Sequence, residues 1–360
     1  MVIKKKQQGF SKPFNLVHEK YYPELSIGPG IYSDYSKAKD SSPKEWIKSD
    51  IKEIEENRNK QIFSFKRYNK KSAVNAPKEL QDIQWVSQSI KTTELEIETN
   101  LQKRLINEEV TGIKNIAYDL EKIKVIDNIK VPRVIDKTTS DIALKAKDAM
   151  ITLHSKLKDV YKIEQLLSIG LLGIKKNRVL VPTKWSITSV DDIISKEIIN
   201  NIRLNPTIDK YQLFTYEFYM NKFYIILMPY NWGFEMIESA GDTFSIDYEL
   251  NNPKKEYASS VTGAYYAARL EVAKYLEKIK RQARIIIFRD IDPSYQSKGV
   301  WVIREAINNA MSKDFLSFET LPYLFKYIDN TLKIRSYIKS WTDQSNILKD
   351  LKYQKRLFEF

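Results

Sequence analysis

The chain has 360 residues, and its 42% hydrophobic content is enough to build one large domain or two medium ones around a core. It contains no cysteine, which excludes disulfides, thiol nucleophiles, cysteine-ligated zinc and iron–sulfur clusters. The formal net charge of +13 favours a polyanionic partner such as DNA, although a solvated lysine-rich surface is the simpler alternative.

The two histidines, His18 and His154, are far apart in sequence and lack the spacing of metal ligands. We expect no zinc and no other cofactor; magnesium or manganese held by carboxylates would be needed only if the chain were an enzyme. No apolar run reaches the length of a membrane span, and the basic N-terminus lacks the apolar segment of a signal peptide. The sequence therefore predicts a cytoplasmic protein with no membrane partner.

The first part of the chain predicts a basic arm followed by an N-terminal region over residues 14–150. Residues 1–13 are basic and polar, and we expect them to form a flexible arm. The sequence Ser-Pro-Lys-Glu at 42–45 predicts a helix start with a serine cap, a proline in the first turn and a glutamate that closes a capping box. Residues 94–98 alternate glutamate with aliphatic residues, which predicts a strand.

Residues 151–350 are expected to form a C-terminal region that packs with the first into one body, before a short tail over 353–360. Helix and strand patterns interleave there, so the predicted class is α+β, a mixed helix and sheet body. The predicted elements are a helix over 164–173, a strand over 178–185, a helix over 191–202, strands over 213–219 and 222–228, a helix over 264–282, a strand over 283–289 and a helix over 300–311.

The densest polar cluster lies between the predicted strand and the helix that follows it. Lys184, Ser186 and Thr188 are candidates for binding phosphate, and the neighbouring pair Asp191-Asp192 is a candidate for binding a divalent metal. The structural alternative is a helix capped by Ser189, with both aspartates in its first turn, where the helix dipole favours negative charge. Both interpretations remain open from the sequence.

A second cluster surrounds the predicted start of the helix over 264–282. Lys254, Lys255, Thr262, Gly263 and Arg269 combine cations with a glycine at a helix N-terminus, where free backbone N–H groups favour an anion. The spacing matches neither a Walker loop nor a dinucleotide-binding fingerprint. A capped helix with a solvated arginine explains the same residues equally well.

Two further arginines are candidates for binding nucleic-acid phosphate. Arg289 ends a predicted apolar strand, and Arg304 lies in the helix that follows, with acidic residues between them. A structural ion pair is the safer interpretation. Trp185, Trp232 and Trp301 are candidates for stacking on bases, although tryptophans more often belong to the core.

The C-terminus has the form of a sliding-clamp (PCNA) docking peptide, Gln-x-x-aliphatic-x-x-aromatic. One tight helical turn would bring Leu357 and Phe360 to one side to fill an apolar pocket, while Gln354 hydrogen-bonds at its rim and Phe358 adds contacts. The pattern is weak by itself, because a second match begins at Gln282 within a predicted buried strand. Its position at a chain end favours the C-terminal match. The structural alternative is a C-terminal helix in which Leu351 and Leu357 pack on the core.

Several uncommon runs occur in order along the chain. They are SIGLLG at 168–173, LVPTKWSITSVDD at 180–192, TGAYYAARL at 262–270, RQA at 281–283 and GVWVIREA at 299–306, with less sharp runs at 27–29 and 42–46.

Together these runs resemble the archaeal Nre family of DNA-repair proteins. The resemblance implies a role in DNA-damage repair and a clamp-binding C-terminus, but it supplies no catalytic reaction. Many members of that family begin with a four-cysteine zinc finger, which this cysteine-free chain lacks, so zinc is not carried over.

We therefore expect a repair factor that is recruited to DNA through the clamp and binds DNA without sequence preference. The alternative is a metal-dependent nuclease or glycosidase acting on damaged nucleic acid. Its candidate catalytic residues are Lys184, Asp191, Asp192, Glu217 and Glu235.

Overall fold

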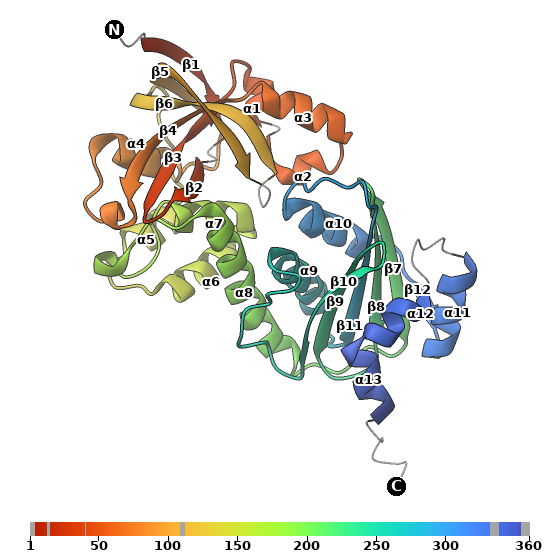
Figure 1. Ribbon diagram of the computed structural model, residues 1–360. Coiled ribbons are helices and arrows are strands. Elements are labelled where there is room, and N and C mark those ends of the chain that lie inside the picture. The colour runs from red at the N-terminus through yellow and green to blue at the C-terminus, as the bar shows by residue number, and fades with distance from the viewer. Residues whose placement is uncertain (1–3, 13–14, 40, 109–111, 332–337, 354–360) are drawn as a thin grey trace. The chain divides into compact units, whose positions relative to one another are not determined.

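Figure 1 shows the computed structural model, which describes residues 4–12, 15–39, 41–108, 112–331 and 338–353. The chain divides into two compact units, unit 1 over residues 1–194 and unit 2 over residues 195–360. This division falls later than the boundary near residue 150 that the sequence suggested. Among the described helices, none has both the length and the apolar character needed to cross a membrane.

Unit 1 is built on a six-stranded sheet. Its strands are β1 (Lys4–Ser11), β2 (Asn15–Tyr21), β3 (Glu24–Ile31), β4 (Ile62–Asn69), β5 (Thr93–Glu108) and β6 (Ile113–Val125). The strand order is β1-β5-β6-β4-β3-β2, and β4 runs parallel to β6 while the other neighbours run antiparallel. The sheet is therefore mixed.

Helices and 3-10 turns connect and follow these strands. They are α1 (Tyr35–Lys39), α2 (Pro43–Trp46), α3 (Ile51–Asn59), η1 (Lys70–Ala73), α4 (Lys78–Val86), α5 (Arg133–Ser140), α6 (Ala146–Leu157), α7 (Val160–Ser168), η2 (Lys175–Asn177) and α8 (Thr183–Ile202). Leu80 and Ile83 of α4 join a core cluster that includes Ile27 and Leu95 of the sheet. Burial of these aliphatic side chains holds α4 against the sheet.

The basic N-terminal segment is not a free arm in this structure, because residues 4–11 form β1. All eight residues pair in antiparallel register with β5. The predicted strand over 94–98 is confirmed as part of β5, and its acids compensate the basic segment: Lys6 lies 3.8 Å from Glu96, and Gln8 donates to Glu94 at 2.6 Å. Backbone pairing and opposite charge explain why the segment is ordered.

Two helix predictions in unit 1 are right in place and wrong in extent. A helix does start at Pro43, but it ends at Trp46, and the side chain of Ser42 makes no capping bond. The helix predicted over 164–173 runs instead from Val160 to Ser168. It stops there because Gly170 and Gly173 adopt φ values of 70° and 105°, which a right-handed helix cannot continue through.

Unit 2 contains a second six-stranded sheet. Its strands are β7 (Tyr211–Phe218), β8 (Asn221–Met228), β9 (Gly233–Ala240), β10 (Thr243–Leu250), β11 (Arg284–Ile291) and β12 (Leu316–Phe318), in the order β10-β9-β11-β8-β7-β12. The strands predicted over 213–219, 222–228 and 283–289 are thus confirmed. Parallel pairing of β9 with β11 makes this sheet mixed as well.

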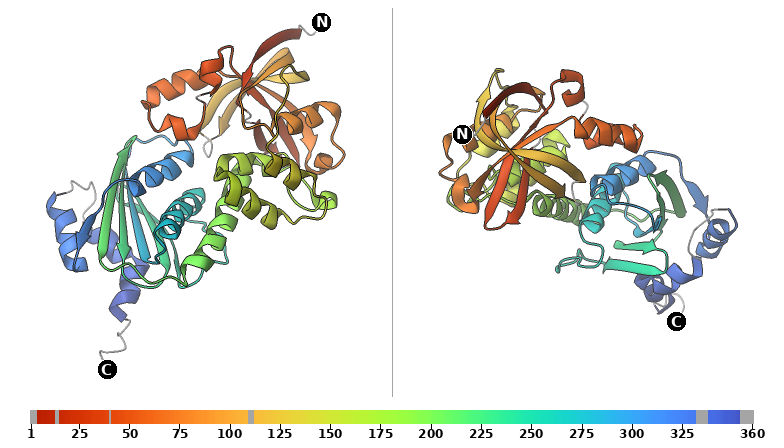
Figure 2. Two further views of the ribbon diagram at one scale, coloured as in Figure 1. Left: turned by 180° about the vertical axis from the view of Figure 1, so that it is seen from behind. Right: turned by 45° about the horizontal axis from the view of Figure 1, so that its top comes forward.

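Helices cover both faces of the unit 2 sheet, as Figure 2 shows. They are α9 (Gly263–Ile279), α10 (Trp301–Met311), α11 (Leu321–Thr331), α12 (Ile338–Gln344) and α13 (Asn346–Tyr353). On one face, Phe234 meets Tyr265 of α9 with ring centroids 5.0 Å apart; on the other, Phe288 stacks on Trp341 of α12 at 4.4 Å. The helices predicted over 264–282 and 300–311 are confirmed, and so is the α+β class.

One charged side chain in unit 1 is buried without a carboxylate against it. The ammonium of Lys162 in α7 donates to the carbonyl oxygens of Ser87 and Ser89 at 3.0 and 2.7 Å and to Oε1 of Gln165 at 2.7 Å. All three acceptors are neutral, and burial lowers the pKa of Lys162 to about 7.

This burial predicts a pH-dependent stability. An unfolded lysine has a pKa of about 10.4, so between roughly pH 7 and 10 the unfolded chain binds a proton at Lys162 that the folded chain has released. The free energy of unfolding therefore rises with pH across that window, by up to about 4 kcal/mol. We expect Lys162→Met to remove this rise, measured as urea unfolding midpoints at pH 7 and pH 9.5. Lys156→Met, an exposed change in α6, is the control; an unchanged slope in Lys162→Met would contradict the assignment.

Candidate functional site

The polar cluster at 183–192 lies on a helix. The strand predicted over 178–185 is wrong, because α8 begins at Thr183 and the carbonyl of Pro182 accepts from the backbone N–H groups of both Trp185 and Ser186 at 3.0 Å. The helix predicted over 191–202 is therefore real, but it starts eight residues earlier. Ser189 lies inside the helix and does not cap it.

The phosphate candidates of this cluster contact the protein itself. Lys184 forms an ion pair with Glu19 of β2, and the hydroxyl of Ser186 donates to the carbonyl of Glu164 at 2.5 Å. Thr188 donates to the carbonyl of Lys184 one turn earlier, at 3.3 Å. These bonds join the start of α8 to β2 and α7.

The two aspartates also lie inside α8 and not in its first turn. Asp191 is fully buried and Asp192 is half-buried. Glu217 and Glu235, the other carboxylate candidates, belong to unit 2. Across the described ranges, no group of three or more acidic or histidine side chains is arranged to hold a metal ion. A catalytic role for these residues stays a prediction.

Arg269, a phosphate candidate, is completely buried in α9. Its guanidinium donates to Oε2 of Glu249 at 2.8 Å and to the hydroxyl of Ser195 at 3.0 and 3.2 Å. The same carboxylate accepts from Trp232 Nε1 at 3.1 Å and from the Tyr265 hydroxyl at 3.0 Å. Burial raises the pKa of Tyr265, which keeps its hydroxyl a donor to this carboxylate.

The other residues of the cluster predicted around the start of α9 lie in the segment from the end of β10 to the first residue of α9. Lys254 pairs with Asp247 at 2.6 Å, while Lys255 is exposed. Thr262 is exposed and adopts a φ of 61° directly before the buried Gly263, where α9 begins. The structure thus brings the predicted residues to one helix start, although two of the cations, Arg269 and Lys254, are paired with acids.

The other two arginine candidates are also buried. Arg289 in β11 donates to Asn221 at 2.9 Å and to Glu238 at 2.6 Å, in agreement with the structural interpretation of the sequence. Arg304 lies in α10 and is 2% exposed. Trp232 is fully buried and Trp301 nearly so, whereas Trp185 is 45% exposed.

Glu235, a catalytic candidate, belongs to β9, and its carboxylate reaches the start of α13. Its carboxylate accepts from the Ser345 hydroxyl, from the backbone N–H of Asn346 at 2.7 Å and from that of Ile347 at 3.4 Å. Burial raises the pKa of Glu235, while the bonds from α13 act in the opposite direction. The carboxylate supplies acceptors for N–H groups that the helix itself leaves unpaired.

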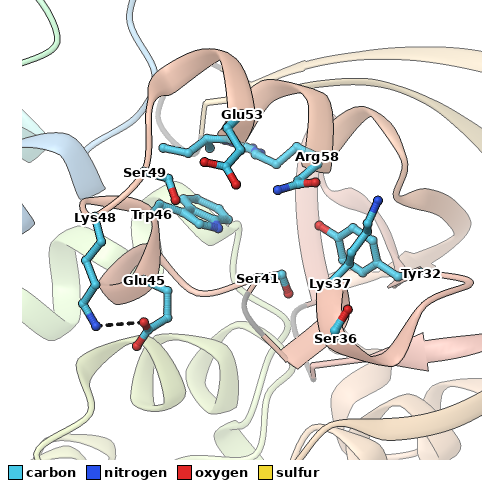
Figure 3. Close-up of a pocket in the computed structure, with 12 residues that line it drawn as sticks. Tyr32, Ser36, Lys37, Ser41, Glu45, Trp46, Lys48, Ser49, Glu53 and Arg58 are labelled. Atoms are coloured by element: carbon cyan, nitrogen blue, oxygen red, sulfur yellow. Dashed lines mark hydrogen bonds and ion pairs between the residues drawn. The ribbon is translucent and has the colours of Figure 1, made fainter.

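A cavity of about 380 Å³ opens in unit 1 between Tyr32 and helices α1, α2 and α3. Figure 3 shows Trp46, Arg58 and Tyr32 around the same hollow, with the ion pair of Glu45 and Lys48, 2.8 Å long, at one side. The guanidinium of Arg58 lies 4.8 Å from the centre of the Trp46 ring. No motif in the sequence marked Arg58 or the cavity.

Three basic side chains, Lys37, Lys48 and Arg58, line this cavity together with two acidic ones, Glu45 and Glu53. Burial lowers the pKa of Arg58 to about 10 and raises that of Tyr32 to about 12. The amino group of Lys60 close to Lys37 lowers the pKa of Lys37. A ring with cations beside it can hold a planar, negatively charged ligand.

The buried network around Glu249 predicts a large loss of stability when its cation is removed. Arg269→Met leaves a buried carboxylate without its counter-charge and should lower the free energy of unfolding by about 3–5 kcal/mol, measured by urea denaturation followed by tryptophan fluorescence. Lys210→Met, which removes an exposed ion pair to Glu319, is the control and should cause no measurable change. A urea midpoint of Arg269→Met equal to that of the parent would show that the network does not contribute to stability. Combining Glu249→Gln with Arg269→Met removes the unpaired buried charge as well and should recover part of the lost stability.

The sequence matches two family descriptions along its length. Residues 1–243 match "Archaeal Nre, N-terminal" and residues 249–360 match "Archaeal Nre, C-terminal". The junction between the two matches falls in β10, so the unit 2 sheet takes strands from both. No solved structure matches the chain.

Relatives from two archaea match the chain. The DNA repair protein NreA of Archaeoglobus fulgidus is 31% identical over 337 residues, covering 91% of this chain and 83% of the relative. NreB of the same organism is 29% identical over 373 residues, covering 98% and 91%. NreA of Haloferax volcanii is 35% identical over 207 residues, covering 54% and 49%. The chain belongs to the archaeal Nre family.

Proposed function

We propose that the chain is a DNA-repair factor that binds DNA through basic surface residues and a sliding clamp (PCNA) through its C-terminal residues. The observation that carries this proposal is the match, over nearly the whole chain, to family members named DNA repair proteins. The surplus of 13 positive charges supports sequence-independent contact with DNA phosphates.

The contacts that hold α13 against the unit 2 sheet support the proposal that the residues after α13 act as a tether. Helix α13 ends at Tyr353, directly before the predicted docking peptide. Glu235 holds the start of α13, and Asp350 near its end pairs with Arg284 of β11 at 2.8 Å. A peptide beginning at Gln354 would therefore leave from a helix that is fixed to the unit 2 sheet.

The docking residues themselves, Gln354, Leu357, Phe358 and Phe360, lie outside the described residues, and their role rests on their spacing. In that spacing Leu357 and Phe360 supply apolar anchors for a groove, and Gln354 supplies a polar contact. Attachment to the clamp raises the local concentration of the rest of the chain at DNA, so even a weak docking peptide is sufficient.

The anchors can be tested in the full chain. Leu357→Ala combined with Phe360→Ala removes both apolar contacts and should weaken binding to an archaeal PCNA at least about ten-fold, measured by isothermal titration calorimetry. Glu359→Gln, a change between the anchors, is the control and should bind as the parent does. Equal affinity of the anchor variant and the parent would exclude this peptide as the docking site.

A further inference from the structure

Three aromatic residues of unit 1 are exposed, two of them consecutive in the chain, and we call Tyr21, Tyr22 and Trp185 the aromatic platform. Their side chains are 39%, 46% and 45% exposed, whereas Tyr32 and Tyr68 of the same unit are buried. The rings of Tyr22 and Trp185 lie with centroids 5.3 Å apart and planes inclined at 54°. The platform is therefore apolar ring surface that the core does not use.

Cations lie against the rings of the platform. The guanidinium of Arg67 lies 4.0 Å from the centre of the Tyr21 ring, and the ammonium of Lys20 lies 5.5 Å from it. The ammonium of Lys70 donates to the Tyr22 hydroxyl at 2.6 Å. Within the part of the chain that the structure describes, no ion pair joins Lys20, Arg67 or Lys70 to a carboxylate. Their charge remains available to an anionic ligand.

The platform is assembled from three separate segments that hydrogen bonds hold in place. The backbone N–H of Lys70 donates to Pro23 at 3.0 Å, and that of Leu180 donates to Lys70 at 2.8 Å, which joins η1 to the β2–β3 turn and to the segment before α8. The N–H of Val17 in β2 donates to the hydroxyl of Thr183 at 2.9 Å. The rings are thus positioned before any ligand arrives, which lowers the entropic cost of binding.

We propose that the aromatic platform is a stacking site for unpaired bases of single-stranded nucleic acid, with Lys20, Arg67 and Lys70 contacting the adjoining phosphates. Exposed rings offer flat surfaces to bases of any sequence, and cations beside them follow the backbone. This inference rests on the proposed DNA binding and gives it a location and a strand preference.

Stacking of bases on exposed rings distinguishes unpaired strands from duplex DNA. In a duplex the faces of the bases are covered by their neighbours, so exposed rings gain nothing and phosphate contacts alone remain. In a single strand each base can leave its stack and lie on an aromatic ring. DNA under repair contains unpaired or unstacked bases, which such a platform would bind.

Fluorescence anisotropy with the full chain tests the inference, using a labelled twelve-residue oligothymidylate and a duplex of equal length. We expect the parent to bind the single strand more tightly, and Tyr22→Ala and Trp185→Ala each to weaken that binding about ten-fold while changing duplex binding little. Trp185→Phe, which keeps a ring, should restore most of the affinity. Trp85→Ala removes a tryptophan of the same unit that is 43% exposed, and it should bind as the parent does.

The cations provide a second measurement. Arg67→Gln and Lys70→Gln should each reduce the slope of log affinity against log salt concentration by about 0.7 on the single strand. An oligouridylate of the same length tests whether RNA binds as well. If bases stack on the rings, Tyr22→Ala and Trp185→Ala should weaken its binding as much as they weaken the binding of the oligothymidylate. Thermal unfolding of every variant should stay close to that of the parent, since Tyr22, Trp185 and Arg67 are exposed and Lys70 is half-buried.

The outcomes separate this inference from the proposed function. If the parent binds both strands with a salt-dependent affinity that Tyr22→Ala and Trp185→Ala leave unchanged, the platform is refuted and DNA binding stands. Equal losses on single strand and duplex would also refute stacking on bases. If the parent binds neither strand at low salt, the proposed DNA binding fails and the inference fails with it.

Discussion

A charged side chain can be buried only where protein groups replace the water around it, and this constraint distinguishes the buried arginines of unit 2 from the cations beside the aromatic platform of unit 1. Arg269, Arg284 and Arg289 are buried, and each donates to a carboxylate at 2.6–2.8 Å. Arg67 is exposed and instead lies over an aromatic ring. The buried arginines hold unit 2 together, whereas Lys20, Arg67 and Lys70 beside the aromatic platform of unit 1 have no carboxylate partner among the described residues and can contact a polyanion.

The sequence predicted those elements whose pattern is local. The segments over 213–219 and 222–228 carry alternating or continuous apolar residues between turn residues, and α9 has apolar residues at helical spacing. All three elements were therefore predicted. The strand over 178–185 was wrong because its apolar run is short, and the bonds from Trp185 and Ser186 to Pro182 start a helix within it. Short apolar runs do not distinguish strand from helix by periodicity.

The candidate sites were less predictable because partners are distant in sequence. Arg289 pairs with Glu238, which is 51 residues away in sequence, and Arg284 pairs with Asp350, which is 66 residues away. The sequence around an arginine therefore does not show whether its side chain binds a phosphate or a carboxylate of the same protein. Trp185 was recognised as a stacking candidate, but its contact with Tyr22 arises only from the fold. Two of the runs that resemble the Nre family make such distant contacts. Gly28 faces the Ser64 carbonyl so closely that a Cβ would overlap it, and the Thr183 hydroxyl accepts from the backbone N–H of Val17.

The proposed docking peptide and the proposed aromatic platform together would let one chain join a clamp to unpaired DNA. The most direct test is the affinity of the full chain for a primer–template junction with a single-stranded overhang, measured with and without a loaded archaeal PCNA. We expect the clamp to raise the affinity by about 10²-fold or more, because the second contact becomes intramolecular. This gain should disappear when residues 354–360 are deleted. An affinity that is the same with and without the clamp would contradict the account.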